Sequence, residues 1–184
     1  MTEKEKMLAG EYYSAIDPEL VRELNETKDI IQQYNNLRPS DTQGRFEILK
    51  NLIGKMADDN ALIIQPFFCD YGKHIRLGKR FFANFNFTLL DEAYVTIGDD
   101  CFIGPNVSIY TACHSTNPIE RNSRKEWALP VTIGNNVWIG GSVTILPGVT
   151  IGDNVTIGAG SVVVKDIPSN VIAVGNPCRV IKRL

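Results

Sequence analysis

Aliphatic residues recur at every sixth position through the C-terminal half of the chain. The step between the third and fourth members of the series equals four hexads, so the phase is kept throughout. An α-helix repeats its apolar face every 3.6 residues, so a period of six excludes a helix here. The period predicts short strands separated by turns, stacked so that each coil covers the apolar residues of the next. The series consists of Ile97, Ile103, Ile109, Ile133, Ile139, Ile145, Ile151, Ile157 and Val163.

A second set of compact residues follows four places after each aliphatic position. Glycine, asparagine and aspartate fill many of the places between the two sets. β-Branched residues favour strands, whereas Gly, Asn and Asp favour turns. We therefore expect both sets to face the interior of the stack. The second set consists of Cys101, Val107, Cys113, Val137, Val143, Val149, Val155, Ser161 and Ile167.

The segment from about Tyr110 to Thr132 separates two stretches of the series and is rich in polar and charged residues. The hexad phase recovers after it, so we interpret this segment as an excursion from the stack. We predict an exposed loop inserted between coils over about 110–132. Long loops on a regular scaffold often carry binding or catalytic residues.

The N-terminal third shows helical patterns in place of hexads. Asp17-Pro18-Glu19 predicts a helix start, with Asp at the N-cap, Pro at the first helical position and an acid in the first turn. A second helix is predicted to begin at Ser40, with Gln43 completing a capping box. Amphipathic helices of this kind need a partner surface, so we expect both to pack on the stack. The predicted units are a helical segment over 1–58 and the coils over 59–184.

Composition excludes several other classes of protein. The formal net charge of -2 argues against general nucleic-acid binding, which needs a basic face. No apolar run approaches the roughly 18 residues of a membrane span, and the first residues lead into no signal peptide. The four cysteines form no C-x-x-C pair, and the two histidines lie far apart. We therefore expect no metal site, no membrane partner and reduced cysteines in a cytoplasmic protein.

The hexads resemble those of the hexapeptide-repeat acyltransferases, and shorter motifs narrow the resemblance to the maltose and galactoside O-acetyltransferases. The resemblance implies a mainly β fold, a left-handed parallel β-helix of triangular section. It also implies an O-acetyltransferase that uses acetyl-CoA as co-substrate, with no permanently bound cofactor, and acts on a sugar such as maltose, glucose or a galactoside. The motifs are Met7–Glu11 with Asp17, Cys69–Gly72, Phe82–Asn86, Glu126-Trp127-x-x-Pro130 and Gly175–Ile181.

His114 is the candidate catalytic residue. Acetyl transfer from a thioester to a hydroxyl needs a base for the hydroxyl proton, and imidazole, with an unperturbed pKa near 6.5, suits that role. By resemblance His114 is this base. Cys113 beside it suggests a nucleophile. Its place in the second set of hexad positions instead predicts a small buried apolar residue.

The resemblance implies an acceptor site formed by Asp17, Asp70, Asn84 and Glu92. Short polar side chains bind sugar hydroxyls at fixed angles and discriminate well between them. Each has another interpretation: Asp17 as a helix cap, and Asp70 and Asn84 as turn residues. Asn84 could also stabilise an oxyanion, and Asp91 could take the role of Glu92.

Acetyl-CoA is expected to lie along the outside of the coils, where glycine permits close approach. Basic residues near the C-terminus suit its phosphates, although a solvated charged tail is the alternative. Trp138 lines this channel or packs against a neighbouring subunit. Relatives often carry Ser or Ala at Gly141 and Thr at Val164, so contacts there would use the backbone. The implied donor site consists of Trp138, Gly141, Ala159, Val164, Lys165, Arg179 and Lys182.

The resemblance also implies a homotrimer with active sites between subunits. Other readings stay open: hexapeptide acetyltransferases for an antibiotic, serine or a sugar nucleotide, and a non-catalytic β-helix protein. Carbonic anhydrases of this fold need three zinc-binding histidines, and this chain has two. Relatives commonly have an Arg near Asn25 and an Asn at the place of His74, which leaves the acceptor open. His74 itself is interpreted as structural or rim-lining.

Overall fold

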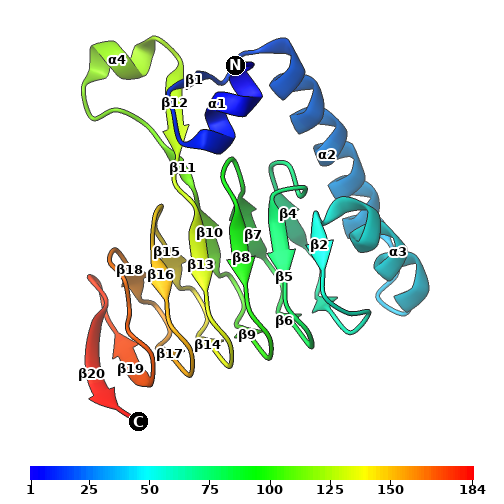
Figure 1. The fold of residues 1–184 in the computed structure, drawn as a ribbon. Coiled ribbons are helices and arrows are strands. Elements are labelled where there is room, and N and C mark those ends of the chain that lie inside the picture. The colour runs from blue at the N-terminus through cyan, green and yellow to red at the C-terminus, as the bar shows by residue number, and fades with distance from the viewer.

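The computed structural model describes Met1–Leu184 and consists of stacked β coils, with two helices towards one end of the column and two above the coils (Figure 1). The coils form a triangular column, so each turn contributes one short strand to each of three sheets. The helices are α1 (Glu3–Ala9), α2 (Pro18–Asn36), α3 (Thr42–Leu52) and α4 (Pro118–Asn122). None of them is long and apolar enough to cross a membrane.

The three sheets run the length of the column, and their strands are parallel except for the last pair. The first sheet contains β2 (Lys55–Met56), β5 (Ile75–Leu77), β8 (Val95–Ile97), β13 (Val131–Ile133) and β16 (Thr150–Ile151). The second contains β4 (Phe67–Cys69), β7 (Phe87–Leu90), β10 (Ser108–Tyr110), β15 (Thr144–Ile145) and β18 (Val162–Val163). The third contains β3 (Leu62–Ile63), β6 (Phe82–Ala83), β9 (Phe102–Ile103), β14 (Trp138–Ile139), β17 (Thr156–Ile157), β19 (Val171–Val174) and β20 (Arg179–Arg183).

The hexad series forms the apolar core of this column. All nine aliphatic positions from Ile97 to Val163 are buried. The register stacks them directly, with Ile133 opposite Ile151 and Ile139 opposite Ile157. Three hexads therefore make one coil, and the prediction of stacked strands from the period is confirmed.

The second set is buried as well, with one exception. Cys113 is only half-buried, because it belongs to β11 (Ala112–Cys113), outside the coils. The chain has already left the column there, and Thr111 is the last buried residue before it does so. The prediction that Cys113 faces the core is therefore wrong. The hexad pattern assigned Cys113 to the column, although this residue lies two positions after Thr111, where the excursion begins.

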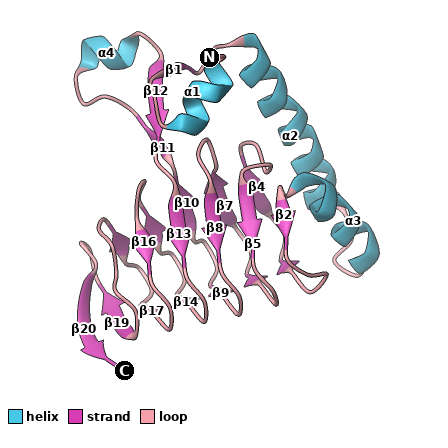
Figure 2. Ribbon diagram, viewed as in Figure 1, coloured by secondary structure: helices cyan, strands magenta, loops and turns pink.

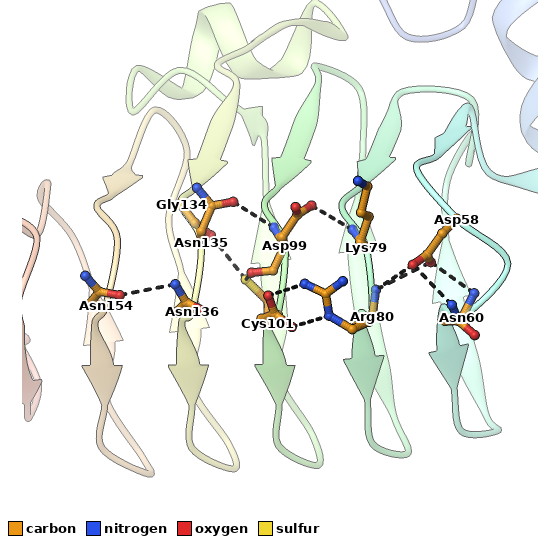
Figure 3. Close-up of polar contacts among 11 residues, drawn as sticks. Asp58, Asn60, Lys79, Arg80, Asp99, Cys101, Gly134, Asn135, Asn136 and Asn154 are labelled. Atoms are coloured by element: carbon orange, nitrogen blue, oxygen red, sulfur yellow. Dashed lines mark hydrogen bonds and ion pairs between the residues drawn. The ribbon is translucent and has the colours of Figure 1, made fainter.

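Polar ladders connect the corners of successive coils (Figure 3). The Asn135 amide nitrogen donates to Asp153, and Asn135 in turn accepts from the backbone of Asp99. Asn136 and Asn154 have φ angles of 55° and bond to each other through their side chains. Asparagine tolerates this left-handed conformation better than most residues. These residues therefore shape the turns of the column.

The helical end differs from the sequence prediction in two places. Asp17 caps α2 as expected, accepting from the amide of Glu19 at 3.0 Å. The cap of α3 is Asp41, whose Oδ1 accepts from the Gly44 amide, so the predicted capping box from Ser40 is wrong. Helix α1 was not predicted, although Thr2 and Glu5 form a capping box at its start.

The excursion after Thr111 is more regular than the predicted loop. It contains β11, α4 and β12 (Lys125–Ala128), and β11 and β12 form an antiparallel pair. β1 (Tyr13–Ser14) adds a third strand by pairing with β12, as the ribbon diagram shows above the coils (Figure 2). The N-terminal segment is thereby joined to the excursion that carries His114.

Candidate active site

His114 follows β11 and its side chain is 57% exposed. It borders a cavity of about 410 Å³ between the excursion and the segment that leads into α2. A base for an external substrate must be reachable from solvent, and this histidine is. The cavity, called the His114 pocket below, is lined by Ala15, Ile16, His114, Arg121, Asn122, Arg124 and Glu126.

A largely buried carboxylate lies beside Nδ1 of the imidazole ring. Oε2 of Glu126 lies 3.4 Å from Nδ1 of His114, and the Glu126 side chain is only 13% exposed. A carboxylate at Nδ1 favours the tautomer with its proton there, which leaves Nε2 free to accept a proton. The same charge stabilises the imidazolium once it forms. Sequence analysis had used Glu126 only as part of a motif and had missed this contact.

Tyr13 supports Glu126 from the opposite side. Its hydroxyl donates a hydrogen bond to Oε1 of Glu126, and its ring is 1% exposed. The two residues face each other because β1 and β12 pair with Tyr13 opposite Glu126. Burial, together with the Glu126 charge, raises the pKa of Tyr13, so the hydroxyl remains a donor. A positioning chain therefore runs from Tyr13 through Glu126 to His114.

Replacing Tyr13 with phenylalanine tests this chain. The variant keeps the buried ring and removes only the hydroxyl. For the acetyl transfer expected from the sequence, kcat should fall about tenfold with little change in KM, because one hydrogen bond to a charged group contributes about this much. Steady-state kinetics measures both constants. In a double-mutant cycle, Tyr13→Phe should have little further effect once Glu126 is replaced by glutamine. Equal losses in both backgrounds would show that Tyr13 acts through the fold alone.

Three carboxylates, those of Asp70, Asp91 and Glu92, directly follow strands β4 and β7 of the second sheet. Asp91 is fully buried, and its Oδ1 accepts from the amides of Asp70 and Tyr71 at 3.0 and 2.8 Å. Burial raises the pKa of Asp91 to about 7. Burial, then the charge of Asp70, raises the pKa of Glu92. Asp91 thus accepts hydrogen bonds from the backbone, whereas Oε2 of the buried Glu92 accepts from the Thr111 hydroxyl at 3.3 Å.

The other acceptor candidates lie at separate places in the chain. Asp17 caps α2 next to Ile16, at the edge of the His114 pocket. Asp70 lines a cavity of about 540 Å³ between α2 and the second sheet. Asn84 lies on a different face, in a groove that shares no residue with the His114 pocket. The structure of one chain therefore does not bring Asn84 and His114 together.

The groove that contains Asn84 has a volume of about 440 Å³ and crosses the third sheet. It includes three of the predicted donor residues, namely Trp138, Gly141 and Ala159. The side chains of Trp138 and Phe102 stand out from this face, 59% and 55% exposed. Glycine is required at position 140, because a Cβ there would lie 2.6 Å from the Ala159 nitrogen. At Gly140 the groove floor is therefore backbone.

The remaining donor candidates lie outside this groove, towards the C-terminal end of the column. Lys165, Arg179 and Lys182 are exposed and form no ion pair, and Val164 is half-buried beside Lys165. His74 is buried, and its Nδ1 lies 2.6 Å from the carbonyl oxygen of Asp91. That contact makes His74 a structural residue. No group of three or more His, Cys, Asp or Glu side chains is placed to hold a metal ion.

Comparisons with known families agree with this architecture. Residues 6–57 match the maltose acetyltransferase hexapeptide capping motif, and residues 130–165 match the bacterial transferase hexapeptide repeats. Residues 94–113 match the hexapeptide repeat of succinyl-transferase. Among relatives, a putative acetyltransferase of Saccharomyces cerevisiae is 50% identical over 98% of this chain and 92% of its own length. The galactoside O-acetyltransferase of Escherichia coli is 41% identical over 98% and 88%.

Solved structures give the same result. A maltose O-acetyltransferase from Clostridium difficile superposes with a TM-score of 0.98 at 50% identity, covering 100% of this chain and 98% of that one. A galactoside acetyltransferase in complex with coenzyme A has a TM-score of 0.95 at 41% identity, covering 100% and 91%. A hexapeptide-repeat acetyltransferase from Vibrio cholerae, complexed with acetyl coenzyme A, has a TM-score of 0.91 at 34% identity, covering 100% and 99%.

The fold and these matches define a hexapeptide-repeat acetyltransferase. Within that class, the chain belongs to the family of the maltose and galactoside O-acetyltransferases. The resemblance seen in the sequence is confirmed.

Proposed function

We propose that this protein transfers an acetyl group from acetyl-CoA to a hydroxyl of a sugar of the maltose, glucose or galactoside type. The observation that carries the proposal is the exposed imidazole of His114, whose Nδ1 lies 3.4 Å from the largely buried carboxylate of Glu126. The relatives named for galactoside and maltose acetylation support the acceptor class. We also propose a cytoplasmic location, in which the four cysteines would stay reduced.

The transfer proceeds by direct attack. Nε2 of His114 takes the acceptor proton as the hydroxyl oxygen bonds to the thioester carbonyl carbon. The carbon–sulfur bond then breaks, and the imidazolium returns the proton to the departing thiolate of CoA. Glu126 stabilises the imidazolium between these steps. Burial, then the charge of Glu126, raises the pKa of the Cys113 thiol, which disfavours a cysteine nucleophile.

Acetyl-CoA binds along the third sheet in this proposal. Its pantetheine arm lies in the groove of Trp138, Gly141 and Ala159, where the backbone is accessible. Its phosphates lie towards the unpaired cations of Lys165, Arg179 and Lys182. Two structures of relatives contain coenzyme A or acetyl coenzyme A, which supports this donor.

The complete site forms between subunits of a homotrimer. Asp17, Asp70 and Glu92 bind the acceptor in this proposal, and Asn84 is supplied by the neighbouring subunit. Within one chain Asp70 lines the cavity beside α2 and not the His114 pocket. Two features of the single chain support this arrangement. Asn84 and His114 occupy separate cavities. The third sheet also exposes large aromatic side chains, Phe102 and Trp138, as surfaces that meet other proteins often do.

Complementation between two inactive variants tests the reaction and the shared site together. The assay follows CoA release from acetyl-CoA with maltose, glucose and a galactoside. We expect His114→Ala and Asn84→Ala each to lose most sugar-dependent release. Equal co-expression of the two should restore about a quarter of wild-type activity, because random assembly leaves that share of the sites with both residues intact.

The outcomes separate the parts of the proposal. Mixed trimers as inactive as the single variants would place both residues in one subunit's site and overturn the shared arrangement. Wild-type protein that releases no CoA with any of the three sugars would overturn the sugar acceptor, with an antibiotic, serine or a sugar nucleotide as the next acceptors to test. Mixing separately purified trimers, whose subunits do not exchange, is the matched control.

A further inference from the structure

The open wall of the His114 pocket is cationic. Two of its lining residues are arginines, Arg121 and Arg124, and both are exposed. Glu126 is the one carboxylate in the lining, and its two oxygens already face Tyr13 and His114. The arginines therefore meet no counter-charge within the pocket.

The guanidinium of Arg121 is held in place but not neutralised. Its Nη1 donates to the carbonyl oxygen of Ser115 at 3.1 Å, across the loop that follows His114. Glu120 lies next to Arg121 in sequence, yet its Oε2 accepts from the Ser115 hydroxyl at 2.6 Å and pairs with neither arginine. The other two guanidinium nitrogens of Arg121, Nε and Nη2, form no hydrogen bond with the protein. A positioned guanidinium with unused donors is suited to an anionic ligand.

Arg124 occupies a backbone conformation that costs free energy. Its φ of 62° lies in the left-handed region, where residues other than Gly, Asn and Asp are uncommon. Arg80 has a similar φ of 54° at a corner of the coils, but its Nε donates to Asp100 at 2.6 Å, and its Nη2 lies 2.5 Å from the same carboxylate. The Arg124 side chain has no such partner. Arg124 directly follows Ser123, the C-cap of α4, a position that usually takes Gly or Asn.

We propose that the preferred acceptor is a sugar bearing an anionic substituent, a phosphate or a carboxylate, which Arg121 and Arg124 bind while His114 deprotonates a hydroxyl. This inference rests on the proposed O-acetyltransferase function. A cavity of about 410 Å³ falls in the size range of small-molecule sites. Arginine binds phosphate and carboxylate groups through paired N–H donors, so two arginines favour charged over neutral acceptors.

The test compares three acceptors that share one ring: glucose, glucose 6-phosphate and glucuronate. We expect at least one charged acceptor to have a kcat/KM about tenfold higher than glucose or more. Charge-assisted hydrogen bonds contribute enough free energy for a difference of this size. Comparison of glucose 6-phosphate with glucuronate distinguishes a phosphate site from a carboxylate site. Higher ionic strength should reduce the preference, because the arginines are exposed.

Arg124→Gly is the informative variant, because glycine adopts this φ without strain and the loop should fold at least as well. We expect it to lower the ratio of charged to neutral kcat/KM about tenfold. Arg124→Lys should keep part of the preference for charged acceptors, because lysine retains the positive charge but lacks the paired N–H donors of the guanidinium. Arg38→Gln, which removes an exposed positive charge away from the pocket, is the matched control and should leave the ratio unchanged.

Three results would overturn the proposal. If the wild-type protein acetylates glucose with the same kcat/KM as both charged sugars, it has no preference for an anionic acceptor. The proposed sugar O-acetyltransferase function would then stand without that preference. An Arg124→Gly variant that keeps the wild-type ratio removes Arg124 from acceptor binding. A raised KM for acetyl-CoA with an unchanged acceptor ratio would assign the arginines to the donor. Absence of release from these three sugars and also from maltose and a galactoside would instead defeat the proposed function itself.

Discussion

Replacing His114 with alanine should lower kcat for sugar acetylation by about 10²–10⁴-fold, the usual contribution of a positioned general base. The acceptor hydroxyl would have to lose its proton to water, and the departing thiolate would have no acid beside it. KM values should change little, because the imidazole acts mainly on the transition state. Steady-state CoA release with saturating acetyl-CoA measures this loss.

Cys113→Ala is the matched control for that experiment. The thiol adjoins His114 in sequence, and its half-buried position in β11 tolerates a smaller side chain. We expect this variant to retain activity within about twofold, because direct attack needs no enzyme nucleophile. A loss comparable to that of His114→Ala, together with a trapped acetyl-enzyme, would show a covalent route through Cys113 and would refute the proposed mechanism.

Truncating Phe87 to alanine should produce the largest loss of stability. Phe87 is fully buried in the second sheet, with the rings of Phe67 and Phe81 at 6.0 and 6.1 Å. Phe→Ala changes in a packed core typically lower the free energy of unfolding by about 3–5 kcal/mol. For a chain of this size, that corresponds to a fall in Tm of about 6–20 °C.

Thermal unfolding of both proteins at one concentration measures the Phe87 effect, since assembly makes Tm depend on concentration. Ile145→Val is a control at an equally buried hexad position. It removes one methylene group and should cost about 0.5–1.5 kcal/mol. If Phe87→Ala lowered Tm no more than this control does, the coils would have closed the cavity, and the aromatic cluster would not limit stability.

The hexad period was sufficient to predict the column, because the same short pattern of residues builds every coil. Each coil uses the same side-chain positions, so one phase predicted which residues are buried from Ile97 to Val163. The prediction failed at Cys113, where the period still held in the sequence but the chain had already left the column. The polar composition of 110–132 indicated where the excursion lies, but the hexad phase continues through Cys113 and so assigned that residue to the column.

The helix caps show the same limit on a smaller scale. Asp17 was predicted correctly, since Asp-Pro-Glu favours one start. Ser40 and Asp41 are both good caps, and the choice between them depends on where α3 packs. Helix α1 is seven residues long, which is too short for a periodic signal. Its capping box between Thr2 and Glu5 was the one sequence feature that could have indicated it.

The sequence by itself determined the fold class, the family and the candidate base His114, because hexads and motifs are local patterns of residue types. Only the tertiary structure placed Glu126 and Tyr13 behind His114, since their contact joins strands more than a hundred residues apart. It also placed Asn84 on another face and left Arg121 and Arg124 without counter-charges. Cross-strand contacts, burial and unpaired charge arise from chain packing, and no spacing along a single sequence specifies them.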